Sequence, residues 1–415
     1  MNILVIGSGG REHALALAAS KSALCDSLYC APGNPGMAKI GTNVAIAADD
    51  IAALADFAKQ NQIDLTIVGP ENALADGIVD AFEEQGLKVF GPTKAAAQVE
   101  ASKDFAKGLM KKYGIPTAGY QTFTELEPAA AYVKEHGAPI VIKENGLKAG
   151  KGVTVAMNED DAIDALNIAF EIPGNSVVIE DYLDGFEFSL IALVNRDLVV
   201  PLECAQDHKR VGDGDTGPNT GGMGSYSPVR KITPELVNEA METIMVPMAK
   251  AMQAEGVPFT GFLYGGLMVT DKGIQVIEFN ARFGDPEAEV ILCRLESDFV
   301  QAILDVMNGE KPDLVWSDKT SHGVVLASEG YPASSTKNAA IKGVDDVDGL
   351  VYHMGTKTDR DALLSNGGRV LMVVSLEDTL EEAMAKTYQE LEKIDCDKLF
   401  WRSDIGRKDL DNGEE

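Results

Sequence analysis

Glu278, Asn280 and Arg282 are the residues of this chain whose types and spacing best suit metal and phosphate chemistry. They belong to the sequence VIEFNARFGDPEAE, which runs from position 276 to position 289. Its apolar and β-favouring residues predict a strand, on which alternate side chains share one face. A carboxylate and an amide oxygen suit Mg²⁺, and a planar guanidinium suits a phosphate anion. An edge strand whose polar residues face water is the alternative, and the pattern alone leaves both interpretations open.

Turn chemistry limits this strand at both ends. Residues 270–273, TDKG, predict a hairpin turn ahead of it, and residues 283–286, FGDP, break the strand after it. We therefore expect Asp285 and Glu287 in a loop beside the polar face.

The charge of the chain restricts its partners. It has 415 residues, enough for two to four domains, and a net charge of −29 from 36 Lys and Arg against 65 Asp and Glu. So acidic a chain repels phosphate on average, and we expect neither nucleic acid nor a membrane as its partner. Any anion must instead be bound by local clusters of Lys and Arg.

Targeting signals and cysteine usage indicate a cytoplasmic protein. The N-terminus lacks the basic and apolar segments of a signal peptide, and no apolar run approaches the length of a membrane span. The five cysteines are scattered without a C-x-x-C pair, which favours free thiols in a reducing compartment over disulfides or a zinc site.

Three strand–turn–helix units are predicted in the first 100 residues. The turns after the strands read GSGG at 7–10, GPEN at 69–72 and GPT at 91–93. Alternating strands and helices imply an open parallel sheet, whose ligands bind beyond the carboxyl ends of the strands. NAD binding is the rival interpretation, but its G-x-G-x-x-G motif needs glycine where this chain has Glu12. We expect an α/β substrate domain here.

A loop rich in glycine and lysine lies between two predicted strands near position 150. The strands are predicted at 139–143 and 153–156, and the loop reads GLKAGKG at 146–152. It is not a Walker A loop, in which Lys is followed by Ser or Thr and a helix begins. Its glycines allow close approach to an anion, whereas a solvated hairpin tip is the alternative. Lys143, at the end of an apolar strand, favours an anionic partner or a carboxylate.

Two further segments contain polar residues that suit a nucleotide or another anion. Glu180 and Glu187 could hydrogen-bond an adenine amino group and a ribose, although isolated residues of this kind are more often surface carboxylates. The segment 206–228 is predicted to be a long loop, and it begins with the cationic cluster His208-Lys209-Arg210. Because loops of this length are commonly functional, we expect an anion-handling lid.

Ten motifs in order give the chain a resemblance to the glycinamide ribonucleotide synthetase family of the ATP-grasp superfamily. They are IGSGGREHA at 6–14, APGN at 31–34, TIVGPE at 66–71, FGPT at 90–93, GAPIVIK at 137–143, GLKAGKGV at 146–153, QDHKRVGDGDTGPNTGGMGSYSP at 206–228, GFLYGGLM at 261–268, VIEFNARFGDPE at 276–287 and NGGRV at 366–370. One glycine loop would be weak evidence, but an ordered series over nearly the whole chain is specific.

The resemblance implies an α/β and α+β protein of three domains. It places an open parallel sheet at 1–100, an ATP-grasp fold at 101–320 with a mobile lid subdomain at about 115–188, and a small α+β domain at 321–415. The implied reaction joins glycine to phosphoribosylamine with ATP and Mg²⁺ (or Mn²⁺), through a glycyl phosphate, in purine biosynthesis. We expect small-molecule substrates only, and a monomer or weak homodimer.

The resemblance also assigns roles to individual residues. For ATP it implies Lys103, Lys143, Gly150, Lys151, Gly152, Glu180, Tyr182, Leu183 and Glu187. For the metal it implies Glu278 and Asn280, and for phosphoryl transfer Arg282, Lys143 and Lys103. For the substrates it implies Gly9, Gly10, Arg11, Glu12, Pro70, Glu71, Asp207, Lys209, Arg210, Asn219, Asp285, Pro286 and Glu287.

The chain departs from the family pattern at several positions. Glu144, Asn145 and Lys148 replace Ala, Asp and Ala, Phe186 replaces Glu, and Ala288-Glu289 replaces Thr-Gln. Lys148 could contact a phosphate or pair with Glu144.

Other functions remain as alternatives. Another ATP-grasp ligase or carboxylase would share the nucleotide residues, and only the acceptor loops would distinguish it. A nucleotide-binding regulator is a third alternative, which Glu278, Asn280 and Arg282 together disfavour. After about position 321 no catalytic group is apparent, and His322 and His353 are expected to be structural.

Overall fold

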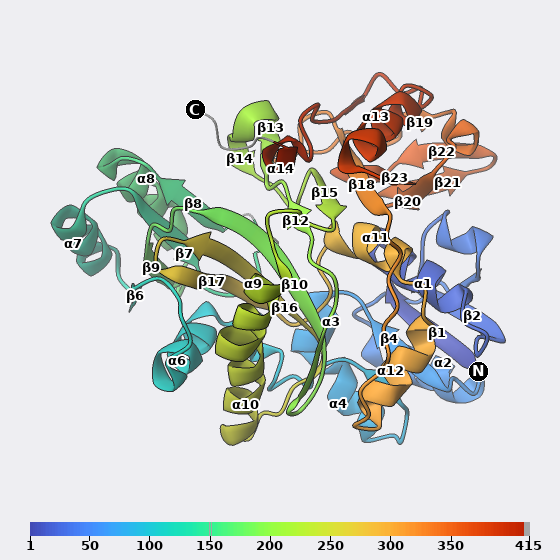
Figure 1. Ribbon diagram of the computed structural model, residues 1–415, viewed down its shortest axis with the longest axis horizontal. Helices are drawn as coiled ribbons and strands as arrows, with labels where there is room; N and C mark the ends of the chain where they lie inside the picture. The colour runs from blue at the N-terminus through green and yellow to red at the C-terminus, as the bar shows by residue number, and fades with distance from the viewer. Residues whose placement is uncertain (149, 151, 411–415) are drawn as a thin grey trace.

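The computed structural model describes residues 1–148, 150 and 152–410. Its N-terminal part is a five-stranded sheet in the order β3-β2-β1-β4-β5, with every pair parallel (Figure 1). The strands are β1 Asn2–Gly7, β2 Ser27–Pro32, β3 Thr42–Asn43, β4 Leu65–Val68 and β5 Val89–Phe90, and the helices are α1 Gly10–Ser20, α2 Ile51–Gln60, α3 Glu71–Asp76, α4 Ile78–Glu83 and α5 Gln98–Ala101. The predicted open parallel sheet is confirmed.

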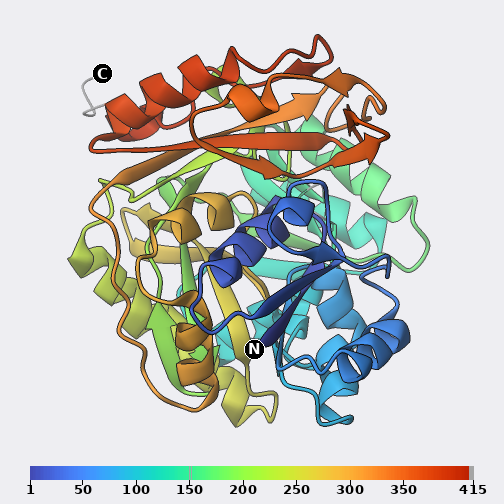
Figure 2. The same ribbon diagram turned by 90° about the vertical axis from the view of Figure 1, so that its right-hand side faces the viewer.

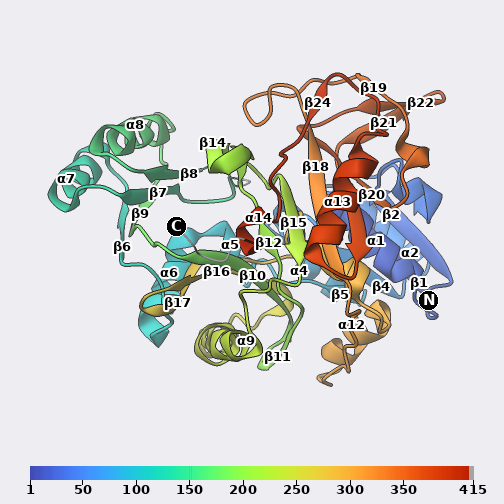
Figure 3. The same cartoon turned by 45° about the horizontal axis from the view of Figure 1, so that its top comes forward.

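The first half of the central part is an antiparallel sheet in the order β6-β9-β7-β8 with its own small core. It lies to one side of the molecule with α7 and α8 (Figures 1 and 3). Its elements are β6 Tyr120–Phe123, α7 Leu126–His136, β7 Ile140–Glu144, β8 Val153–Ala156, α8 Glu159–Phe170 and β9 Val177–Asp181. The 146–152 loop therefore joins two strands, as predicted.

The second half of the central part is an antiparallel sheet in the order β11-β10-β16-β17. Its strands are β10 Phe186–Asn195, β11 Leu198–Pro201, β16 Thr260–Thr270 and β17 Gly273–Asn280. The helices of this region are α6 Lys103–Tyr113, α9 Pro234–Ala240, α10 Val246–Ala254, α11 Glu287–Ile291 and α12 Phe299–Met307. Thr270 pairs with Gly273, so the predicted hairpin before the polar strand is confirmed.

The C-terminal part is a layer of strands and helices that covers the N-terminal sheet (Figure 2). Its main sheet has the order β12-β15-β18-β23-β20, with β24 paired to β18. The elements are β18 Thr320–Ser328, β19 Ala340–Ile341, β20 Leu350–His353, β21 Thr356–Asp359, β22 Ala362–Ser365, β23 Arg369–Glu377, α13 Leu380–Leu391, β24 Leu399–Phe400 and α14 Arg407–Leu410. The Asn34 amide donates to the His353 carbonyl, at 2.9 Å, where the layers meet.

The 206–228 segment differs from the irregular loop that was predicted. It contains the short strands β12 Gln206–Asp207, β13 Arg210–Gly212, β14 Thr216–Asn219 and β15 Gly224–Ser227. β13 and β14 pair with each other, while β15 pairs with β18, whose position in the sequence lies far away. The local composition of Gly, Asp and Asn indicates turns and gives no sign of a partner strand so distant. Among the described helices none is long and apolar enough to cross a membrane.

Candidate functional site

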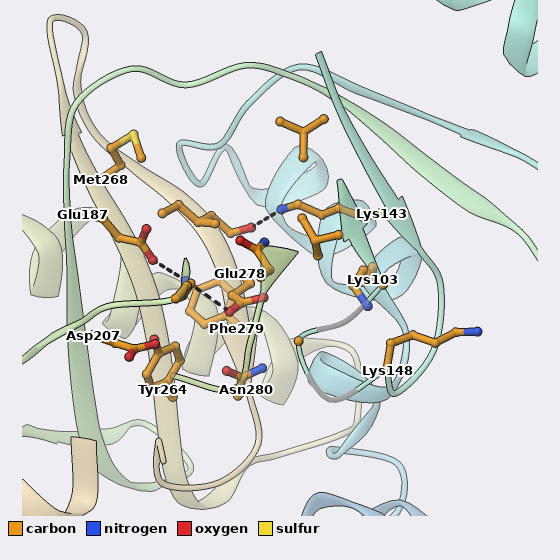
Figure 4. A pocket seen from close by; sticks show the side chains of 18 of the residues that line it. Lys103, Lys143, Lys148, Glu187, Asp207, Tyr264, Met268, Glu278, Phe279 and Asn280 are labelled. Carbon is orange, nitrogen blue, oxygen red and sulfur yellow. Dashed lines mark hydrogen bonds and ion pairs between the residues drawn. The ribbon is translucent and has the colours of Figure 1, made fainter. Parts of the chain in front are cut away.

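A cavity of about 570 Å³ opens between the two central sheets, the 206–228 segment and the carboxyl ends of the N-terminal strands. Figure 4 shows lysines on one side of it and the polar residues of β17 between them and Glu187 and Asp207. The predicted site residues that line it are Arg11, Glu71, Lys103, Lys143, Gly150, Gly152, Glu180, Tyr182, Leu183, Glu187, Asp207, Lys209, Arg210, Asn219, Glu278, Asn280, Arg282, Asp285 and Glu287. Lys151 lies outside the described residues.

Lys103 begins helix α6, because the Ser102 side chain caps that helix by accepting from the Phe105 amide at 3.2 Å. Its Nζ donates to the Gly146 carbonyl at 2.9 Å, and its backbone amide donates to Asn145 Oδ1 at 2.9 Å. Burial lowers the pKa of Lys103, against the raising effect of Glu278. A desolvated ammonium group that borders a cavity and the glycine-rich loop is suited to an anion.

Glu180 lies between two buried lysines. Its Oε2 is 2.8 Å from Lys107 Nζ, and its Oε1 is 3.0 Å from Lys143 Nζ. Lys143 also donates to the Ile277 carbonyl at 2.8 Å (Figure 4). All three side chains are at most 5% exposed, so this triad has a buried net charge of +1. The excess positive charge is available to a phosphate.

Glu278 and Asn280 project from β17 into the cavity, as the strand pattern predicted. Burial raises the pKa of Glu278, but Lys209, Lys143 and Lys103 together lower it below its usual value. Lys209 contacts Glu187 closely and lies 3.8 Å from Glu278. The described residues contain no cluster of three or more His, Cys, Asp or Glu that could bind a metal. One carboxylate and one amide fit a cation that takes its other ligands from phosphate and water.

Arg282 follows the end of β17 and is held by two glutamates of the N-terminal region. Its Nη2 is 3.0 Å from Glu100 Oε1, and its Nε is 3.5 Å from Glu71 Oε2. Glu100 also accepts from the Ala281 amide at 2.7 Å. Burial would raise the pKa of Glu71, but Arg282 and Arg11 lower it to about 2. The guanidinium is thus fixed at the junction of the sheets.

Glu12 supports a turn and does not line the cavity. It is 3% exposed, and its carboxylate accepts from the Gly9 amide at 2.7 Å and from Arg11 Nε at 2.6 Å. A Cβ on Gly7, where φ is +123°, would lie 2.3 Å from its side chain. Glu12 therefore fills the space that a third glycine leaves open in dinucleotide folds. Its predicted contact with a substrate stays a prediction.

The remaining predicted residues of the N-terminal turns and the 283–286 turn also lie outside the cavity lining. Gly9 and Gly10 precede and begin α1, and Pro70 precedes Glu71 at the start of α3. The Pro286 carbonyl accepts from Ser225 Oγ at 2.7 Å, which connects the turn to β15. These residues shape the backbone around the cavity.

Asp285 and Arg369 form the wall of the cavity at the C-terminal layer. Their Oδ1 and Nη1 atoms are 2.9 Å apart, and Arg369 also donates to the carbonyls of Asp285 and Gly221. We call the group Arg11, Glu71, Asp285, Glu287 and Arg369 the acceptor end of the cavity. Lys103, Lys143, Glu278 and Asn280 form its phosphate end.

Glu287 is bound by two buried hydroxyl groups. Its Oε1 accepts from Ser189 Oγ at 2.8 Å and from Tyr264 Oη at 3.0 Å. Asp207 lies nearby, and burial and then the charge of Glu287 raise its pKa well above the usual value. The Asp207 Oδ1 atom has no hydrogen-bond partner among the described residues. Glu287 therefore places a carboxylate at the acceptor end that suits an ammonium group, and the Asp207 carboxyl beside it offers a further hydrogen-bonding oxygen.

The glycine-rich loop and the 206–228 segment meet over the cavity. A Cβ on Gly150, where φ is +74°, would lie 2.9 Å from the Thr220 carbonyl. Arg210 pairs with Asn219 across β13 and β14 and donates to the Gly217 carbonyl at 2.8 Å. Lys148 lines the cavity and pairs with Glu144 at 2.8 Å, so the predicted ion pair is present and its contact with a phosphate stays a prediction.

Sequence reasoning missed several residues that line the cavity, among them Glu100, Lys107, Tyr264 and Arg369. A signal existed for three of these. Lys107 follows Lys103 by one helical turn, which places both on one face, while Tyr264 belongs to the GFLYGGLM motif and Arg369 to the NGGRV motif. Glu100 had no such signal, because its partners Arg282 and Ala281 are distant in the sequence.

Comparisons with known proteins agree with this geometry. Models described as phosphoribosylglycinamide synthetase N domain, ATP-grasp (A) domain and C domain match residues 1–100, 101–288 and 321–408. A phosphoribosylamine–glycine ligase from Halalkalibacterium halodurans is 51% identical over 98% of this chain and 97% of its own. The corresponding protein of Streptococcus pneumoniae R6 is 48% identical over 98% and 99%.

Solved structures extend the comparison to the fold. A phosphoribosylamine–glycine ligase from Thermotoga maritima has a TM-score of 0.86 and 34% identity, covering 98% of this chain and 100% of its own. The biotin carboxylase domain of a Hydrogenobacter thermophilus 2-oxoglutarate carboxylase shares the fold with a TM-score of 0.72 and 18% identity, over 96% and 91%. On these findings, the chain belongs to the phosphoribosylglycinamide synthetase family.

Proposed function

We propose that the chain joins glycine to 5-phosphoribosylamine, with conversion of ATP to ADP and phosphate, in purine biosynthesis. The observation that carries the proposal is the division of one cavity into a phosphate end and an acceptor end, with Arg282 at their junction. Family membership makes the chain an ATP-grasp ligase, and the two ends fit a reaction between a nucleotide and a small amine.

The nucleotide occupies the phosphate end in this proposal. Lys103 and Lys143 contact its phosphates, and the loop with Gly150 and Gly152 closes over them. Charge-assisted hydrogen bonds to phosphate contribute about 1.5–3 kcal/mol each, more than neutral ones. Tyr182 and Leu183 follow β9 at the cavity wall, where they would hold the base, and Glu187 would hold the ribose.

Glu180 has a second role beside the expected bond to adenine. Because both of its oxygens face ammonium groups, it also acts on the nucleotide through Lys107 and Lys143. It positions the two lysines and offsets part of their repulsion.

Glu278 and Asn280 would hold Mg²⁺ (or Mn²⁺). When bound, the cation would neutralise phosphate charge and orient the phosphoryl group. Lys209 then has to leave Glu278 and remain with Glu187, which already holds it more closely. Lys209 thus serves as the counter-charge of Glu278 before the cation binds.

The chemistry proceeds in two steps at the junction of the two ends. A carboxylate oxygen of glycine attacks the γ-phosphorus of ATP, the bond to the β-phosphate oxygen breaks, and ADP leaves. Arg282 stabilises the charge on the transferring group, because Glu71 and Glu100 fix its guanidinium in advance. The amine of phosphoribosylamine then attacks the acyl carbon of glycyl phosphate, phosphate leaves, and the amine loses a proton.

Water must be excluded between these steps because it would hydrolyse the acyl phosphate. The contact between Gly150 and Thr220 brings the two covering segments together above the cavity. A site closed by two segments protects such an intermediate. Asp207 and Glu287 are suited to hold the glycine ammonium group below this cover.

Release of ADP tests the proposal. With Mg²⁺ and ATP present, we expect full release only when glycine and freshly generated phosphoribosylamine are added together. Release that is indifferent to either compound would refute the ligase function. Release with bicarbonate in place of glycine would instead indicate a carboxylase.

A further inference from the structure

Glu289 is a fully buried carboxyl group without a hydrogen-bond partner in the described part of the chain. It lies on α11 with 0% exposure, and neither of its oxygens receives a hydrogen bond from another described residue. A Cβ on Gly10 would lie 2.2 Å from Oε1, so the carboxyl group faces the first turn of α1 directly. Such a group lowers stability when charged, and its presence beside the acceptor end requires another explanation.

Arg369 is ion-paired with Asp285 and also acts electrostatically on Glu289. Asp285 is paired with Arg369 at 2.9 Å, and a Cβ on Gly9 would lie 3.6 Å from Asp285 Oδ2. Burial and then the charge of Asp285 raise the pKa of Glu289 well above its usual value, while Arg369 has the opposite effect. Glu289 therefore keeps its proton at a pH at which an ordinary glutamate has lost it.

Other groups around α11 do not compensate a charge on Glu289. On α11 itself, Glu287 is a second acid. Burial raises the pKa of Tyr352 on β20 well above the usual value, and it raises the pKa of the Cys293 thiol, next to α11, to about 12. Neither of these two groups carries a positive charge. Arg11 of α1 is paired with Glu12, while burial lowers the pKa of His13 on α1 to about 3 and of His322 on β18 to about 4. On β15, Tyr226 donates its hydroxyl to Gln206.

We propose that Glu289 is a positioning residue for the acceptor end: its uncharged carboxyl group sets the spacing between Asp285, Arg369 and the turn at Gly9–Gly10. The proposal rests on the proposed function and extends it: phosphoribosylamine binds at this end, beside the glycine that Glu287 holds. When Glu289 loses its proton, a second negative charge competes with Asp285 for Arg369 and loosens both the ion pair and the turn. The phosphate end, which lies on other elements, is unaffected.

This arrangement gives the enzyme a sensitivity to alkaline pH that depends on one carboxyl group. Glutamine has nearly the same shape as glutamate and is uncharged at every pH. The Glu289→Gln variant should therefore keep the geometry of the acceptor end and lose the sensitivity. Because both proteins meet the same substrates at each pH, the ratio of their kcat/KM values cancels the titration of ATP, glycine and phosphoribosylamine themselves.

The test compares the wild type with Glu289→Gln from neutral to alkaline pH, with phosphoribosylamine as the varied substrate. We expect equal kcat/KM values near neutral pH and a relative loss in the wild type above the pKa of Glu289, up to about tenfold per pH unit. The loss should lie in the KM for phosphoribosylamine, with the KM for ATP unchanged. A ratio that is independent of pH would overturn the proposal.

A matched control and a second measurement separate this role from general stability. Glu390 on α13 is 1% exposed, does not line the cavity and is paired with Lys386 and Lys393, so Glu390→Gln removes a buried carboxylate elsewhere in the fold. The ratio of this variant to the wild type should be independent of pH, and a pH-dependent ratio would count against our proposal. Infrared spectra of the wild type should contain the C=O band of a protonated carboxyl that Glu289→Gln lacks, and absence of that difference would also overturn it. Absence of turnover in both proteins would instead refute the ligase function.

Discussion

The buried triad of Lys107, Glu180 and Lys143 leads to a quantitative prediction for Glu180→Gln. The substitution keeps the shape of the side chain and leaves two ammonium groups, 2.8 and 3.0 Å from that position, without their counter-charge. Removing one partner of a buried ion pair costs about 3–5 kcal/mol. This loss of stability has an upper limit, because the folded variant can instead release the proton of one lysine. At pH 7, keeping a lysine of reference pKa uncharged costs about 4.6 kcal/mol.

This upper limit falls as the pH rises, so the loss of stability should decrease at higher pH. In the variant a folded lysine is uncharged while the unfolded chain still binds the proton, so stability rises with pH by about 1.4 kcal/mol per unit. We therefore expect a loss of about 3–5 kcal/mol at pH 7 that decreases by about 1.4 kcal/mol up to pH 8 and changes little above it, because there the wild type also loses the Lys107 proton. Lys107 is the group that gives up its proton, because burial already lowers its pKa to about 8.

Native-state hydrogen exchange of the β7 and β9 amides is the appropriate assay, because a chain with several cores is not expected to unfold in one step. Glu187→Gln is the matched control: Glu187 lines the same cavity, but it and Lys209 are 33% and 27% exposed. A partly exposed pair contributes less than about 1 kcal/mol. Equal losses in the two variants would refute the reasoning that Glu180 balances two buried lysines.

Three further predictions concern the metal, the cover of the cavity and acid stability. Glu278→Ala should abolish phosphoryl transfer with the fold retained by circular dichroism, and near-normal turnover at limiting Mg²⁺ would exclude Glu278 as a metal ligand. In Gly150→Ala, where φ is +74°, the new Cβ would lie 2.9 Å from the Thr220 carbonyl and should separate the two covering segments. Water could then hydrolyse the acyl phosphate, so that more ADP is released than product is formed. Equal amounts of ADP and product would contradict the contact. Burial lowers the pKa of four histidines, so the unfolded chain binds protons at a higher pH than the folded protein does. The free energy of unfolding should therefore fall below about pH 6.5, by about 1.4 kcal/mol per pH unit for each histidine. A urea midpoint that stays constant between pH 6.5 and 5 would contradict this. These histidines are His13 and His208, with pKa values of about 3, and His322 and His353, with pKa values of about 4.

The sequence was sufficient for the elements whose information is local. The alternation in β17 and the turn at 270–273 predicted the polar face, and the glycines at 146–152 predicted a loop between strands. The order of the motifs predicted the family. Each of these features depends on residues within a few positions of one another, where backbone preference and side-chain period act directly.

The features that could not be predicted depend on contacts between distant residues. Glu180 has the composition of a nucleotide ligand, yet α6 brings Lys107 to one oxygen and β7 brings Lys143 to the other. Glu12 has the position of a substrate contact, yet it closes the turn from within. The role of a polar side chain depends on the partners that the fold brings to it. The same local sequence pattern is compatible with a residue that binds a ligand and with one that supports the structure.

The pairing of β15 with β18 has a consequence for the synthesis of the chain. Gly224 pairs with Val324, which the ribosome adds 100 residues later. At about 5–20 residues per second, β15 waits about 5–20 s for its partner strand. During that time its edge is open to other chains, a recognised route to aggregation. β15 is only four residues long and reads Gly-Ser-Tyr-Ser, and so short a strand with little apolar surface is a poor template for a neighbouring nascent chain.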